Sequence, residues 1–151
     1  MRNEAIDRLD VLVGSWRATM RNAWFLEPAD REEPGSAVGE WLGDAFVVFR
    51  WTMTGEVAPA TSEMVLVLGY SDPRKSYTAL YHDERGVARV FDMSFDGLHW
   101  VMTREDSDMF QRFVADVGPL QIAARAEASD DQGATWRKDF DLIFDRIAPA
   151  E

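Results

Sequence analysis

Residues 76–104 read SYTALYHDERGVARVFDMSFDGLHWVMTR, and this stretch decides the fold class. It contains three segments of strand length that are rich in aromatic and β-branched residues, at 76–83, 86–95 and 98–104. The turn sequences Asp83-Glu84-Arg85-Gly86 and Asp96-Gly97 lie between them. Strand-length segments joined by such short turns are typical of antiparallel hairpins. The stretch therefore predicts three consecutive antiparallel strands.

The same pattern continues in both directions along the chain. Further strand-like segments lie at 36–42, 45–54, 63–70, 109–116, 120–128 and 136–146, and another begins near Trp16. Residues 3–13 instead carry apolar side chains at helical spacing, and Gly14 ends that segment. About ten strands make a sheet too large to stay open, so we expect closure. We predict an all-β fold, a closed antiparallel barrel of about ten strands with a short N-terminal helix, as a single domain over residues 1–151.

The composition restricts the compartment and the partners. The formal net charge is −11, and such a surface repels nucleic-acid phosphates and anionic lipid headgroups. The chain has no cysteine, which excludes disulfides, thiolate metal sites and a cysteine nucleophile. The sequence starts with a charged, helix-like stretch and no long apolar run, so we expect neither a secretory signal nor a membrane-spanning segment. We expect a cytoplasmic protein with no nucleic-acid or membrane partner, and we leave open whether it forms a homodimer.

Several short motifs occur in an order that resembles a known family. The first, Leu12-Val13-Gly14-Ser15-Trp16, contains the Gly-x-Trp start common in calycins. The later motifs are Phe49-Arg50-Trp51, Leu68-Gly69-Tyr70-Ser71-Asp72, residues 81–90, Trp100, Arg104, Phe110-Gln111-Arg112-Phe113 and residues 136–142. Together they resemble a family of bacterial proteins of unknown function with a lipocalin-like (calycin) barrel. The resemblance implies a lipocalin-like barrel and implies no particular activity.

The sequence does not predict a metal or a cofactor. His82 and His99 lie on separate segments, and neither belongs to a His-x-His or His-x-x-x-His pair. Calycin barrels that bind haem resemble Gly-x-Trp-x-Gly-x-Gly at the first strand, whereas residues 14–20 read GSWRATM and lack the later glycines. The chain also lacks a Gly-x-Ser-x-Gly nucleophile motif and a glycine-rich phosphate loop. We therefore expect no metal site and no cofactor.

Residues 129–136 fit Ser-x-Asp-x-Gly-x-Thr-Trp, the Asp-box seen in sialidase propellers. In those propellers the motif stabilises a hairpin turn, because its Asp binds backbone amides and its Gly supplies a positive φ. A propeller needs several copies, and this chain has one. The motif therefore predicts a hairpin turn and not a sialidase.

Cations on apolar strand faces are the most informative candidates for a site. Arg89 alternates with Phe91 and Met93, Arg104 with Trp100, and Lys138 with Phe140, whereas Asp139 and Asp141 alternate with apolar residues and are expected to face water. A buried cation requires either an internal carboxylate or an anionic ligand, unless it lies at a strand end and reaches water. An arginine suits a ligand carboxylate, because its planar fork bonds both oxygens. The candidate ligand-binding residues are Arg50, Tyr81, Arg89, Phe91, Met93, Trp100, Arg104 and Lys138.

The leading functional hypothesis is binding of a small, largely apolar molecule inside the barrel, with or without a carboxylate. A barrel of this size can enclose a cavity that side chains do not fill. One alternative is an enzyme of isomerase or cyclase type in the same cavity, with Tyr81, His82 and Asp83 as acid or base candidates. The other is a structural or interaction protein with a filled barrel. The sequence leaves the catalytic question open.

Overall fold

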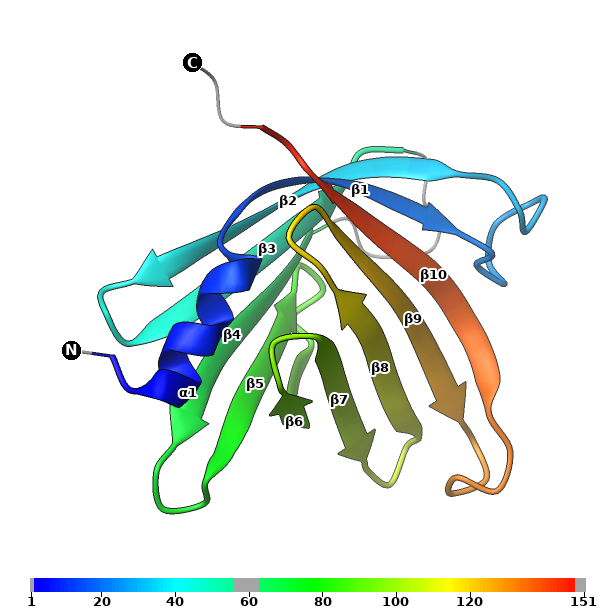
Figure 1. Cartoon of the computed structure of the whole chain (residues 1–151). Coiled ribbons are helices and arrows are strands. Elements are labelled where there is room, and N and C mark those ends of the chain that lie inside the picture. Colours follow the sequence, from blue (N-terminus) through cyan, green and yellow to red (C-terminus); the bar gives the residue numbers. More distant parts are fainter. Residues whose placement is uncertain (1, 56–62, 149–151) are drawn as a thin grey trace.

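The computed structural model describes residues 2–55 and 63–148 and contains ten antiparallel strands that close into a barrel (Figure 1). In chain order the strands are β1 (Gly14–Arg21), β2 (Glu33–Leu42), β3 (Phe46–Met53), β4 (Glu63–Ser71), β5 (Ser76–Asp83), β6 (Ala88–Phe95), β7 (His99–Glu105), β8 (Phe110–Val117), β9 (Gln121–Ser129) and β10 (Arg137–Arg146). Each strand pairs with its neighbours in sequence, and β1 closes the barrel by pairing with β10. The prediction of an all-β closed barrel with a short N-terminal helix is confirmed.

The helical segment at the start of the chain is shorter and more irregular than the predicted 3–13. It consists of α1 (Glu4–Asp7) followed by a 3-10 helix, η1 (Arg8–Leu12). The Asn3 side chain caps α1 by accepting a hydrogen bond of 2.8 Å from the Ile6 N–H. Ile6, Leu9 and Leu12 are buried, so the segment covers one end of the barrel, which we name the helix-covered end. No helix in the described part of the chain could cross a membrane.

The Gly-x-Trp motif secures the helix-covered end. Trp16 is fully buried on β1, and the Arg146 guanidinium from the end of β10 lies 4.0 Å from the centre of a Trp16 ring. Arg146 also donates hydrogen bonds to the carbonyls of Val11 and Val13, at 2.7 and 2.8 Å. Gly14 has a φ of +135°, and a Cβ there would lie 2.4 Å from Arg146 Nη1. The motif thus lets one arginine join the helix, the first strand and the last strand.

Large inward-facing side chains fill the half of the barrel next to the helix. Phe49, Trp100 and Phe144 are each at most 1% exposed. The Phe49 ring meets those of Trp100 and Phe144 edge to face, at centroid distances of 5.9 and 5.3 Å. Aromatic pairs of this geometry pack densely, so this half is a solid core. The opposite end, formed where β1, β3, β5, β7 and β9 finish, is named the open end.

Candidate functional site

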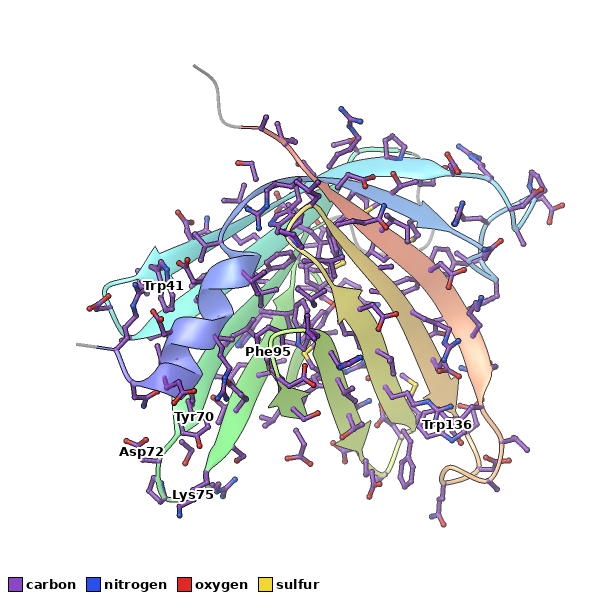
Figure 2. The ribbon with its side chains drawn as sticks, in the orientation of Figure 1. Trp41, Tyr70, Asp72, Lys75, Phe95 and Trp136 are labelled. Atoms are coloured by element: carbon purple, nitrogen blue, oxygen red, sulfur yellow. The ribbon has the colours of Figure 1, made fainter. Side chains whose placement is uncertain are left out.

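A cavity of about 350 Å³ lies at the open end of the barrel. Its wall is mainly apolar and includes Trp51, Met64, Leu66, Phe91, Met102 and Phe113. Figure 2 shows Trp136 near the open end, far from Trp41 and Tyr70, which lie on the side of the helix-covered end. The volume falls within the range of sites for small molecules, about 300–1,000 Å³. The barrel is therefore only partly filled by its own side chains.

Four arginines contribute to the cavity lining, and three of them pair with carboxylates. Arg85 lies 2.7 Å from Asp83, Arg112 lies 3.1 Å from Glu127, and Arg137 pairs with Asp130. The Arg112 guanidinium also stacks 4.0 Å from the centre of a Trp136 ring. These three cations are already neutralised, so none of them needs an anion from outside the protein.

Arg89 is different from the other three arginines. It is half-buried on β6, and its Nη1 donates a hydrogen bond of 2.9 Å to the side-chain oxygen of Gln111. Gln111 is neutral, and no carboxylate of residues 2–55 and 63–148 forms an ion pair with Arg89. The same Gln111 oxygen accepts a second hydrogen bond from Arg104 Nε, also at 2.9 Å. Since that oxygen faces two guanidinium groups, the Gln111 amide N–H groups are left as donors beside Arg89.

Tyr81 lies next to Arg89 across the pairing of β5 with β6. Its hydroxyl donates a hydrogen bond of 2.9 Å to Asp83 Oδ2, which also receives Arg85. The hydrogen bonds from Arg85 lower the pKa of the Asp83 carboxyl to about 2, whereas burial, aided by Asp83, raises the pKa of the Tyr81 phenol. Near pH 7 the Asp83 carboxyl is therefore ionised, and the Tyr81 hydroxyl is protonated and acts as a neutral donor. Neither group has a pKa near neutrality, where a general acid or base is most effective.

Asp139 enters the cavity lining because of a β-bulge. The pairing of β10 with β9 shifts between Lys138 and Phe140, so Asp139 is an extra residue on β10. Asp139 Oδ1 accepts a hydrogen bond of 3.2 Å from Trp24 Nε1, in the connection after β1. Burial raises the pKa of the Asp139 carboxyl, although Arg137 acts in the opposite direction. The expectation that Asp139 faces water is wrong, because alternation across the bulge does not hold.

Three of the eight candidate residues line the cavity: Tyr81, Arg89 and Phe91. Met93 and Trp100 face inward as predicted, but they are buried in the core and do not belong to the lining. Arg104 is 7% exposed and pairs with Asp106 and Asp108, at 3.2 and 3.1 Å. Arg104 therefore has carboxylate partners within the protein, which is one of the alternatives expected for a buried cation.

Arg50 and Lys138 lie outside the cavity. Arg50 has an exposed side chain and pairs with Glu40 at 3.2 Å. Lys138 is also exposed and pairs with Asp141 at 3.1 Å. The predicted face for Lys138, shared with Phe140, is wrong for the same reason as for Asp139: the bulge turns Lys138 to the outside.

Sequence reasoning missed Gln111 and Asp139 as cavity residues. Gln111 carries a readable signal, since it alternates with Phe113, Ala115 and Val117 on an otherwise apolar face of β8. A lone amide on such a face needs hydrogen-bond partners, and Arg89 and Arg104 are those partners. The bulge that admits Asp139 has no comparable signal in the sequence.

The histidines do not contribute to the cavity. His82 is exposed on β5, and His99 is exposed with its Nδ1 3.0 Å from Asp96 Oδ2. Among the described residues there is no group of three or more His, Asp or Glu side chains placed to hold a metal ion.

The Asp-box forms the turn between β9 and β10, as predicted. Asp131 accepts hydrogen bonds from the Thr135 N–H and the Ser129 hydroxyl, both at 2.8 Å. Gly133 has a φ of +87°, and its N–H bonds Ser129 Oγ at 2.8 Å. The motif thus stabilises a hairpin at the rim of the cavity.

Comparison with known proteins supports the fold and goes no further. No family model matches the chain, and no curated protein matches it. The chain is similar to a solved structure, that of Rv2717c from M. tuberculosis, with a TM-score of 0.66. The alignment covers 98% of this chain and 100% of that chain at 13% sequence identity. At this identity the likeness supports a shared barrel fold alone.

Proposed function

We propose that the barrel binds a small, largely apolar molecule that carries a carboxylate, and that this carboxylate pairs with Arg89. The observation that carries the proposal is the state of Arg89, which lies in a mainly apolar cavity with a neutral amide as its side-chain partner. A cation that is partly removed from water without an anion carries a desolvation cost, which a ligand carboxylate offsets.

The surroundings of Arg89 fit a carboxylate in particular. The guanidinium presents a planar fork, and the Gln111 amide adds neutral donors beside it. The other cations of the lining are occupied by Asp83, Glu127 and Asp130. The site would therefore take one acidic group, with the rest of the ligand packed against the phenylalanine and methionine side chains. The resemblance of the sequence to lipocalin-like proteins is in keeping with this use of the barrel.

The size of the cavity limits the ligand. At about 30 Å³ for each water-sized group, a volume of about 350 Å³ holds on the order of twelve such groups. A straight-chain acid of about eight carbons fits this limit, and we choose octanoate as the probe.

Calorimetric titration of octanoate and 1-octanol tests the proposal. A charge-assisted hydrogen bond contributes about 1.5–3 kcal/mol, so octanoate should bind the wild-type protein about 10- to 100-fold more tightly than 1-octanol. Arg89→Met should remove this preference. Arg50→Met is the matched control, because it deletes an arginine outside the cavity, and it should leave the preference unchanged. Equal affinities for acid and alcohol in the wild-type protein would refute the proposal.

The two alternative hypotheses receive less support. An isomerase or cyclase that uses Tyr81, His82 and Asp83 is disfavoured because the pKa of Tyr81 is raised and that of Asp83 is lowered, both away from neutrality, and because His82 lies on the outer face of β5. An interaction protein with a filled barrel is disfavoured by the cavity itself.

A further inference from the structure

The cavity contains a second charged group that lacks an ion-pair partner, and it belongs to a different wall. Asp139 forms no ion pair with any cation of the described residues, and its Oδ2 accepts no hydrogen bond from them. Arg89 is on β6 and Asp139 is on β10. In the ring of ten strands, β6 is four steps from β10 in one direction and six in the other, so the two residues project from nearly opposite walls.

We infer that the natural ligand carries a protonated amine at the end opposite its carboxylate, and that this amine pairs with Asp139. The inference rests on the proposed function, because the carboxylate at Arg89 determines which end of the ligand reaches Asp139. The ligand class is then an amino acid in which an apolar spacer separates the two charges.

The environment of Asp139 fits an ammonium group. Trp24 donates to Oδ1 and so fixes the carboxylate, while Oδ2 remains as an acceptor. Phe140, the next residue on β10, and Phe25 pack edge to face at 6.4 Å, and both contribute to the lining beside Asp139. Aromatic side chains beside a carboxylate suit a cationic group, because the face of an aromatic ring attracts positive charge as the carboxylate does.

Between the two charges the lining is apolar apart from Arg112 and Glu127, which pair with each other, and this supports the spacer. Leu66, Phe91, Met102 and Phe113 lie on β4, β6, β7 and β8 and offer no charged group to a ligand. A ligand with a charge in its middle would bury that charge against these side chains without a partner. Charges at the two ends of an apolar chain avoid this cost.

Calorimetry with 8-aminooctanoate and octanoate tests the inference in three proteins. The variant is Asp139→Asn, which keeps an oxygen for Trp24 and removes the negative charge. The matched control is Asp141→Asn, on the same strand but paired with Lys138 outside the cavity. Circular dichroism and thermal unfolding establish that each variant is folded.

The expected result concerns the ratio of the two dissociation constants. In Asp139→Asn, 8-aminooctanoate should lose at least 10-fold in affinity, whereas octanoate should keep its affinity or gain. In Asp141→Asn both ligands should bind as they do to the wild-type protein. Two results would overturn the inference while octanoate still binds through Arg89. One is an unchanged ratio in Asp139→Asn, and the other is no binding of 8-aminooctanoate to the wild-type protein. In both cases the proposed function stands. If octanoate shows no preference over 1-octanol, the proposed function fails and the inference fails with it.

Discussion

The two ends of this barrel differ in how completely their polar side chains are paired within the protein. At the helix-covered end, Trp16 Nε1 donates to the Leu12 carbonyl at 3.2 Å, and the Tyr77 hydroxyl donates to the Ala5 carbonyl at 2.6 Å. Trp41 Nε1 likewise donates to Asp10 Oδ1 at 2.9 Å. These three tips are satisfied, as expected where packing serves stability, whereas Trp100 Nε1 in the adjoining core has no hydrogen-bond partner among the described residues.

The open end leaves comparable groups without partners. The buried Trp51 Nε1, which belongs to a cavity residue, has no hydrogen-bond partner among the described residues. Arg89 and Asp139 lack ion-pair partners there as well. Unsatisfied buried groups cost stability, and proteins keep them mainly where a ligand or a reaction uses them. Arg89 and Asp139 are half-buried in the cavity lining of the open end without ion-pair partners, and this indicates that the open end binds while the helix-covered end holds the barrel together.

Trp16→Ala should produce the largest effect, because it empties the most tightly built part of the helix-covered end. Replacing a fully buried tryptophan by alanine costs about 3–5 kcal/mol of unfolding free energy. Chemical denaturation measures this loss. Trp24→Ala is the control at the open end, where the side chain is 65% exposed, and it should cost less than about 1 kcal/mol. Similar losses of unfolding free energy in the two variants would contradict the structural difference between the two ends.

Gly39→Ala should destabilise the contact between the helical segment and the barrel. A Cβ at Gly39 would lie 2.1 Å from the Leu12 carbonyl oxygen, so the backbone of η1 has to move. Overpacking of this kind costs about 1–3 kcal/mol. Gly118→Ala is the control, because its Cβ would lie 3.4 Å from the nearest atom. Thermal unfolding should show a lower midpoint for Gly39→Ala only, and an unchanged midpoint would mean that the helical segment does not press on β2.

Arg104→Met and Arg89→Met separate a structural arginine from a binding arginine. Arg104 loses contacts with Asp106, Asp108 and Gln111, so its replacement should cost about 1–3 kcal/mol. Arg89→Met breaks no ion pair within the described residues and should cost less than about 1 kcal/mol. Urea titration of both variants checks the order. A larger loss for Arg89→Met would make Arg89 a structural residue.

The sequence predicted the strands and one wall of the site well. Alternation within regular strands placed Arg89 and Phe91 inside the barrel and identified Arg104 as an inward-facing cation. The prediction failed for Lys138 and Asp139, because one inserted residue on β10 reverses the faces that alternation assigns. Which cation keeps a carboxylate partner depends on the geometry of turns and side chains, as for Arg104 with Asp106 and Asp108, and alternation does not contain that information.

Asp139→Asn should have the smallest effect on stability, and its sign is informative. Burial raises the pKa of Asp139 in the folded protein, so wild-type stability is lost as the pH rises through that pKa. Trp24 and Arg137 favour the charged form and Asp130 opposes it, but burial prevails. Asparagine does not titrate, so the variant should unfold at a higher temperature than the wild type near pH 7. The difference should disappear below about pH 4, near the ordinary carboxyl pKa. A variant less stable at pH 7 would contradict this account of Asp139.

The central claim, that the open end is the binding end, is tested most directly by following the tryptophan indole N–H signals of ¹⁵N-labelled protein by NMR during titration with octanoate. Each signal can be assigned by a single Trp→Phe substitution. We predict that the Trp51 signal shifts, because Trp51 lines the cavity and its Nε1 lacks a partner. The signals of Trp16 and Trp41 at the helix-covered end should stay in place, because each donates to a fixed oxygen of the protein. Movement of the Trp16 or Trp41 signal with an unchanged Trp51 signal would contradict the account.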